Sequence, residues 1–262
     1  MRGLVLLLLC CLVALPAAAE TPEEKAMRIM REAEARDDGY KWSTAQGLMI
    51  LRSASGSSSE REFTTKAVEV SEDEGRGMLI FTAPADIART ALLTIGYKNE
   101  DDDQWLYLPA LKRVKRISAG GKTGAFVGSE FSYEDLSAPA IEDFTHLWLG
   151  EAPCPGQEAL VCDIIERRPL DEDSGYTRIV TWQDQSDYRP HYTEFYDRKN
   201  ALLKVLQTYD YQLHKDRYWR ASRLVMTNVV NGKSTEMLWK SFDFDTPLSA
   251  EDFTTRSLER LQ

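Results

Sequence analysis

The sequence predicts a mostly β protein in which one large antiparallel sheet curls towards a barrel. Apolar residues recur with a period of two over much of the chain, which is typical of strands. Roughly ten to eleven such runs follow one another at hairpin spacing, and many short strands separated by turn signals favour a barrel. Only two segments have the apolar spacing of helices, so we expect few helices.

The N-terminus is expected to be a secretory signal peptide, residues 1–19. Arg2 precedes an apolar run over residues 4–15, and small residues at 17–19 form an A-x-A cleavage site before Glu20. A membrane anchor would need roughly 20 apolar residues, and this run is shorter. Cleavage leaves 243 of the 262 residues, which carry no Gly/Pro/Ser-rich linker. We therefore expect residues 20–262 to form a single domain.

The first helix is expected to begin at Thr21 and to end before Gly39, because Pro22 and two acidic residues occupy its first turn. A second helix is expected over residues 141–149. The remaining runs are expected to be strands, at residues 49–51, 63–70, 78–82, 90–97, 104–108, 160–166, 177–183, 189–196, 202–213, 218–230 and 235–244.

Charge and cysteine content exclude several classes of function. The chain has a formal net charge of −10, and an acidic surface repels phosphate backbones, so no nucleic-acid partner is expected. Cys154 and Cys162 are the cysteines that remain after removal of the signal peptide. In an exported protein we expect them to form a disulfide. Their spacing matches no zinc motif, so no metal site is expected.

Motifs for catalysis or a cofactor are weak. The glycine-rich segment 120–124 resembles a phosphate-binding loop, but Arg116 occupies the position of the first glycine. The three histidines lack the spacing of a zinc hydrolase. A carboxylate pair such as Glu134 and Asp135 could serve a glycosidase, yet such pairs arise by chance among 42 acidic residues. We expect a protein that is not an enzyme, with no catalytic residues and no cofactor.

Two of the expected strands are apolar on both faces. In residues 92–97 and 105–108 neither alternate set of side chains is polar. An antiparallel sheet with one face in water should alternate between apolar and polar residues. Both faces of these strands are therefore expected to be covered, either by helices and loops of the protein or by an apolar ligand.

Residues 105–117 read W-L-Y-L-P-A-L-K-R-V-K-R-I, and residues 128–136 read G-S-E-F-S-Y-E-D-L. These segments resemble signatures of the LolA-like outer-membrane lipoprotein-sorting protein family, with Glu130 where Asp is usual. Residues 81–87 and 252–258 are also similar to that family. The resemblance implies a half-open antiparallel β-barrel lidded by helices. It also implies a periplasmic carrier that moves lipid or acylated lipoprotein between inner and outer membranes, with an inner-membrane transporter of the resistance-nodulation-division type as a possible partner. We further expect the exported mature protein to be a monomer.

A bound acyl chain is expected to contact side chains of the strands that are apolar on both faces and of their neighbours. The candidates are Met49, Leu79, Phe81, Leu93, Ile95, Trp105 and Tyr107. Because a shift of one residue reverses the two faces of a strand, the pattern leaves open which alternate set faces inward.

A basic run stands out in this acidic chain: Lys112, Arg113, Lys115 and Arg116. It could meet a lipid headgroup or an acidic partner, or it could be a solvated edge strand that is protected by charge. Two alternatives to the carrier also stay open at this point. One is a structural or scaffold protein of the cell envelope, and the other is a hydrolase of envelope lipids or glycans.

Overall fold

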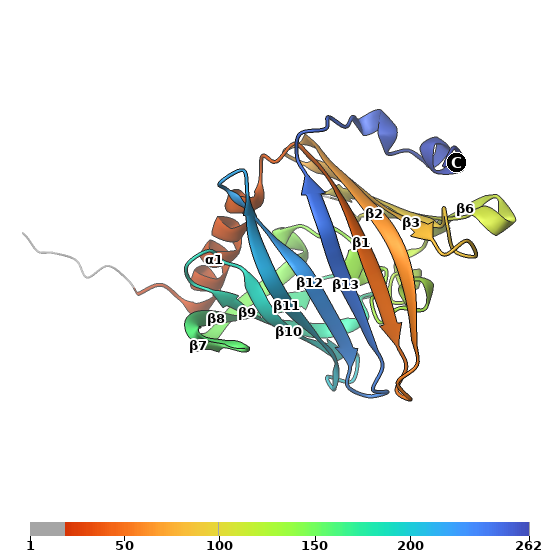
Figure 1. Ribbon diagram of the computed structural model, residues 1–262. Coiled ribbons are helices and arrows are strands. Elements are labelled where there is room, and N and C mark those ends of the chain that lie inside the picture. Colours follow the sequence, from red (N-terminus) through yellow and green to blue (C-terminus); the bar gives the residue numbers. More distant parts are fainter. Residues whose placement is uncertain (1–18, 99, 262) are drawn as a thin grey trace, which may run out of the picture.

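Thirteen antiparallel strands form one sheet that curls into a half-open barrel (Figure 1). The computed structural model describes residues 19–98 and 100–261, so the expected signal peptide lies almost wholly outside the described residues. The strands are β1 (Trp42–Arg52), β2 (Ser58–Ser71), β3 (Glu74–Ala83), β4 (Ala91–Tyr97), β5 (Asp103–Leu108), β6 (Arg113–Ile117), β7 (Phe144–Cys154), β8 (Gln157–Pro169), β9 (Tyr176–Asp184), β10 (Pro190–Asp197), β11 (Leu202–His214), β12 (Tyr218–Asn228) and β13 (Ser234–Asp243).

The order of the strands explains why the barrel stays open. It runs β6-β5-β4-β3-β2-β1-β13-β12-β11-β10-β9-β8-β7, so the first and last strands of the chain pair in the middle of the sheet. The two edges, β6 and β7, follow each other along the chain and are joined by residues 118–143. The predicted fold class, a half-open antiparallel barrel, is confirmed.

The prediction of a helix over residues 141–149 is wrong. Only Ile141–Asp143 form a 3₁₀ turn, and Phe144–Cys154 form strand β7. Phe144, His146 and Trp148 pair with residues of β8 and face the inside of the barrel on alternate positions. Strand pairing between distant residues here outweighs the local helical spacing.

Helix α1 (Pro22–Asp37) lies across the concave face of β7–β9. It starts as expected with a capping box, in which the Glu24 backbone N–H donates to Thr21 Oγ1 at 3.2 Å. Ala26 and Ile29 are buried against Ile165 of β8. Among the described residues, neither α1 nor the short C-terminal helix α2 (Thr255–Glu259) is long and apolar enough to cross a membrane.

The outer face of β4–β6 is covered by the C-terminal segment (Figure 1). Phe253 and Leu258 are fully buried there against Leu93 of β4 and Tyr107 of β5. The chain itself therefore covers the outer side of the strands whose sequences are apolar on both faces.

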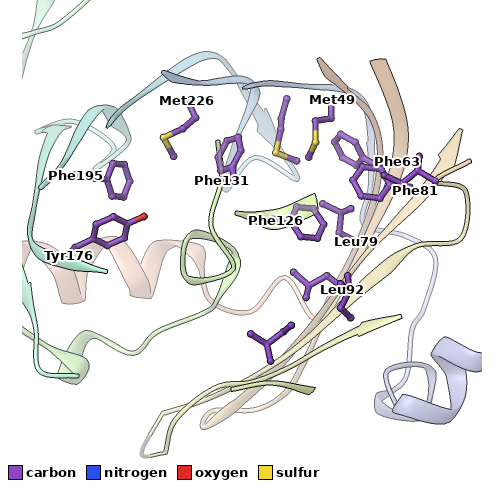
Figure 2. Packing of buried hydrophobic residues seen from close by; sticks show 14 of the residues in the cluster. Met49, Phe63, Leu79, Phe81, Leu92, Phe126, Phe131, Tyr176, Phe195 and Met226 are labelled. Carbon is purple, nitrogen blue, oxygen red and sulfur yellow. The ribbon is translucent and has the colours of Figure 1, made fainter. Parts of the chain in front are cut away.

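The segment 118–143, which we call the connector, folds back onto the concave face. Its Phe126 stacks on Phe81 of β3, with ring centroids 5.7 Å apart. Figure 2 shows Phe126 and Phe131 between the side of the barrel that carries Phe63 and Phe81 and the side that carries Phe195. The connector thus links the two halves of the curved sheet from within.

The predicted disulfide is confirmed. Cys154 and Cys162 are bonded across the β7–β8 hairpin, and both side chains are fully buried.

Candidate ligand-binding cavity

A cavity of about 1550 Å³ lies between the concave face of the sheet, α1 and the connector. This volume exceeds the roughly 300–1,000 Å³ of pockets for drug-sized ligands. Its floor is apolar and comes from both halves of the sheet and from the connector. The apolar residues that line it include Leu79, Leu92, Phe131, Leu136, Ile179, Phe195, Leu206, Leu224, Met226, Met237 and Trp239.

Arginines surround the cavity near the C-terminal end of α1. Arg217 donates to the backbone carbonyls of Ala35 and Asp38, at 3.1 and 2.8 Å. Arg220 pairs with Asp37. These contacts hold the end of α1 to β12 and to the turn before it. The last carbonyls of a helix lack partners within the helix, so they are free to accept from Arg217.

A third rim arginine, Arg189, belongs to a buried polar cluster. Arg189 Nε lies 2.8 Å from Asp184 Oδ2, and His191 Nε2 lies 2.9 Å from the same oxygen. Burial alone would raise the pKa of Asp184. Hydrogen bonds from His191, the Asp187 backbone, Ser186 and Arg189 nevertheless hold that pKa well below its usual range. The cluster fixes the β9–β10 turn at the cavity rim.

The connector is anchored through Asp135, a residue of the 128–136 signature. Its carboxylate accepts hydrogen bonds from the Tyr176 hydroxyl at 2.7 Å and from the Ser132 backbone N–H at 2.6 Å. It also pairs with Lys204 of β11, and both side chains are at most 5% exposed. Burial, and then the negative charge of Asp135, raise the pKa of Tyr176. The signature therefore joins the connector to β9 and β11.

Glu130 and Glu134 anchor the connector at two further points. The Glu130 backbone N–H donates to Thr235 Oγ1, and Asn228 Nδ2 donates to Glu130 Oε2, both at 2.9 Å. Glu134 accepts a hydrogen bond from the Gly175 backbone N–H at 2.9 Å. Burial raises the pKa of Glu134. The carboxylates that could have served a glycosidase are thus each engaged by neighbouring groups.

The anchoring roles of these residues do not follow from the sequence pattern. Lys204 interrupts an apolar run of β11, and its burial marks it as a partner for an inward-facing carboxylate. A buried lysine must be paired, so a lysine at an inward strand position is the signal that could have found it.

The seven candidate contact residues divide between two faces of the sheet. Met49, Leu79 and Phe81 belong to the concave cluster, and Leu79 lines the cavity. The other four pack on the outer face with the C-terminal segment; they are Leu93, Ile95, Trp105 and Tyr107. In β4 the alternate residue Leu92 faces the cavity instead.

The basic run lies on an edge of the sheet. Lys112 follows a 3₁₀ turn, and Arg113, Lys115 and Arg116 lie in the edge strand β6. All four side chains are exposed, and Arg116 pairs with Asp103. Arg113 and Lys115 share a side with the inward-facing Ile117, so they lie on the concave side of the edge.

Comparison with known proteins gives several matches and one negative result. A domain from Vibrio parahaemolyticus, assigned to the outer membrane lipoprotein-sorting proteins, is 45% identical with a TM-score of 0.87; the match covers 91% of this chain and 100% of that one. A DUF1329 family protein from Desulfovibrio piger is 25% identical (TM-score 0.84; 91% and 99% covered). A LolA superfamily protein from Nitrosomonas europaea shares the fold at 16% identity (TM-score 0.69; 88% and 98% covered).

A family model described as an uncharacterized protein matches residues 73–260. The search of curated proteins gives no match. The match at 45% identity covers a whole solved domain. Together with the open barrel, it identifies the family of this chain. The chain belongs to the outer membrane lipoprotein-sorting protein family, and it has the fold of a LolA superfamily protein.

Proposed function

We propose that this protein is a periplasmic carrier that holds the acyl chains of a lipid or lipoprotein in the cavity. The observation that carries the proposal is a cavity of about 1550 Å³ with an apolar floor, in a chain 45% identical to a lipoprotein-sorting domain. In this proposal the mature protein is a monomer that begins at Glu20 and moves cargo between the inner and outer membranes, with an inner-membrane transporter as partner.

The energetics need no catalytic group. Each methylene that leaves water contributes about 0.8 kcal/mol, so burial of its apolar surface is enough to bind a long acyl chain. A scaffold protein would be expected to fill its interior with its own side chains, as close-packed proteins do. The large cavity supports the carrier over the scaffold.

The proposal predicts that the purified protein binds cis-parinaric acid, a fluorescent fatty acid, with energy transfer from Trp219 and Trp239, which line the cavity. Leu224→Asp places a charge on the apolar floor, and Ala221→Phe fills part of the cavity. Each variant is expected to raise the Kd at least about tenfold, because burying a charge or losing apolar contact costs more than 1.4 kcal/mol.

Val230→Asp is the matched control, because Val230 is 73% exposed and the same charge there should leave the Kd unchanged. Native mass spectrometry of protein purified from the periplasm should also release lipid. Undiminished binding by folded Leu224→Asp and Ala221→Phe would place the ligand elsewhere. A wild-type protein that neither binds the probe nor carries lipid would favour the scaffold.

We further propose that the basic edge of β6 meets anionic headgroups or an acidic partner during transfer. Arg113→Glu with Lys115→Glu should slow transfer of the probe to vesicles that contain anionic phospholipid by about tenfold at low salt. The difference should shrink as salt screens the charges, since the Debye length is about 10 Å at 0.1 M. Arg116 is left unchanged because it pairs with Asp103.

Lys199→Glu with Lys233→Glu changes the net charge equally at exposed positions away from β6, and should transfer cargo at the wild-type rate. Equal rates for wild type and the β6 variant at every salt concentration would leave the run as a charged edge that prevents sheet-to-sheet association.

A further inference from the structure

One arginine of the cavity wall differs from the others. Arg167 lies on β8, directly across from His146 of β7 and Ile179 of β9. It lines the cavity together with Phe144 and Ile179. Its guanidinium lies over the Phe144 ring, 5.1 Å from the centroid. A charged group therefore interrupts an otherwise apolar part of the wall.

The guanidinium of Arg167 has no protein partner among residues 19–98 and 100–261. It forms no ion pair and no hydrogen bond there, and its Nε is buried without an acceptor. The other cavity-lining arginines all have partners: Arg36, Arg76, Arg189, Arg217 and Arg220. Burial lowers the pKa of Arg167, and no nearby carboxylate opposes that effect.

The neighbouring His146 presents a second unused polar atom. Its Nε2 lies 2.8 Å from the Ile141 carbonyl, which can only accept, so Nε2 carries the proton. Nδ1 is then a lone-pair acceptor, and it is buried without a partner. Burial is the main reason that the pKa of His146 is lowered, so the ring is neutral near pH 7.

The carboxylates of the cavity are not placed to pair with Arg167. Asp135 is taken by Lys204, and Glu134 by Ser174 and Gly175. Glu142 and Asp143, next to β7, are exposed at the rim. Arg167 is half-buried, and its cation lies at the cavity wall without a protein partner. An unpaired cation that is shielded from bulk water destabilises a folded protein, so a site that keeps one is suited to an anion from outside the chain.

We propose that Arg167 binds the anionic head, a carboxylate or phosphate, of an amphiphile whose acyl chain lies along the apolar floor of the cavity. This inference rests on the proposed carrier function. The planar guanidinium can donate two parallel hydrogen bonds to either group. Displacement of water from the site strengthens the pairing, because charges interact more strongly at low dielectric.

The test compares cis-parinaric acid with its uncharged methyl ester, which share one chain. Wild-type protein should bind the acid about tenfold more tightly than the ester, as expected for a charge-assisted hydrogen bond. Arg167→Met should bind both probes with the affinity that wild type shows for the ester. Arg167→Lys should keep most of the preference for the acid, and Lys233→Met, which removes an exposed charge away from the cavity and from β6, should keep all of it.

The melting temperature separates a binding role from a structural one. Without ligand, Arg167→Met should melt at or above the wild-type temperature, because it replaces an unpaired, half-buried charge by an apolar chain of similar length. A structural arginine would instead lower the melting temperature on substitution and leave the preference for the acid intact. That pair of results overturns the inference.

The remaining outcomes are also decisive. If wild type binds acid and ester equally, the headgroup site is wrong while the carrier function stands. If wild type binds neither, the carrier function fails and the site with it. Displacement of the acid by millimolar inorganic phosphate would show a site for free anions and overturn the assignment to an amphiphile. Where Arg167→Met does not fold, Arg167→Gln takes its place, and a wild-type preference for the acid in that variant overturns the inference.

Discussion

Replacing Asp135 by alanine is expected to lower the free energy of unfolding by about 3–5 kcal/mol, as measured by urea denaturation. The substitution leaves the buried ammonium of Lys204 without its carboxylate, and it removes the acceptor of the Tyr176 hydroxyl. Because Asp135 ties the connector to β9 and β11, the variant is also expected to lose binding of cis-parinaric acid.

The partner variant and a surface pair provide the controls. Lys204→Met should destabilise by a similar amount, and Asp135→Asn with Lys204→Met should cost clearly less than the two single changes together. The exposed pair of Lys215 and Asp245 should contribute little, so Asp245→Ala should barely shift the urea midpoint. Strict additivity of Asp135→Asn and Lys204→Met would contradict the buried ion pair.

Gly47→Ala is expected to destabilise the protein by about 1–3 kcal/mol through overpacking. A Cβ at Gly47 of β1 would lie 2.4 Å from the Phe63 ring and 2.6 Å from the Leu238 carbonyl oxygen of β13. The carbonyl belongs to the backbone of a paired strand, so it cannot move aside as a side chain could. The Phe63 ring packs over this glycine and belongs to the buried cluster of the concave face.

Gly77→Ala, on strand β3 of the same sheet, is the matched control. A Cβ there would have the Lys66 carbonyl oxygen as its nearest neighbour, at an ordinary 4.0 Å. The change should be neutral or stabilising by about 0.4–1 kcal/mol, since alanine restricts the unfolded chain. Thermal or urea unfolding of both variants measures the contrast. Equal free energies of unfolding for the two variants would show that the Phe63 ring and strand β13 move to accommodate the new methyl group without loss of stability.

Local sequence signals predicted the features that depend on residues close together in the chain. Thr21 and Glu24 cap the first helix as expected, and the runs of period two in residues 202–213 and 235–244 correspond to β11 and β13. Cys154 and Cys162 are close in sequence, so a hairpin suffices to bring them together. The signature segments predicted the family because motif identity needs no knowledge of packing.

Other features were beyond the sequence because contacts between distant residues decide them. Leu92 and Leu93 are both leucines, so the pattern cannot say that Leu92 faces the cavity and Leu93 the C-terminal segment. Residues 141–149 satisfy a helical spacing, yet pairing with β8 makes most of them a strand. Asp135 and Lys204 are 69 residues apart, and only the folded connector brings them into contact.

The sequence by itself determined the class of fold, the first helix, the disulfide and the family, because periodicity, caps, short spacing and motifs act within a few residues of chain. The tertiary structure decided the inward set of side chains, the anchoring of the connector, the size of the cavity and the unpaired state of Arg167. These depend on the pairing of β1 with β13 and on the curvature of the sheet, which bring groups far apart in the chain to one concave face.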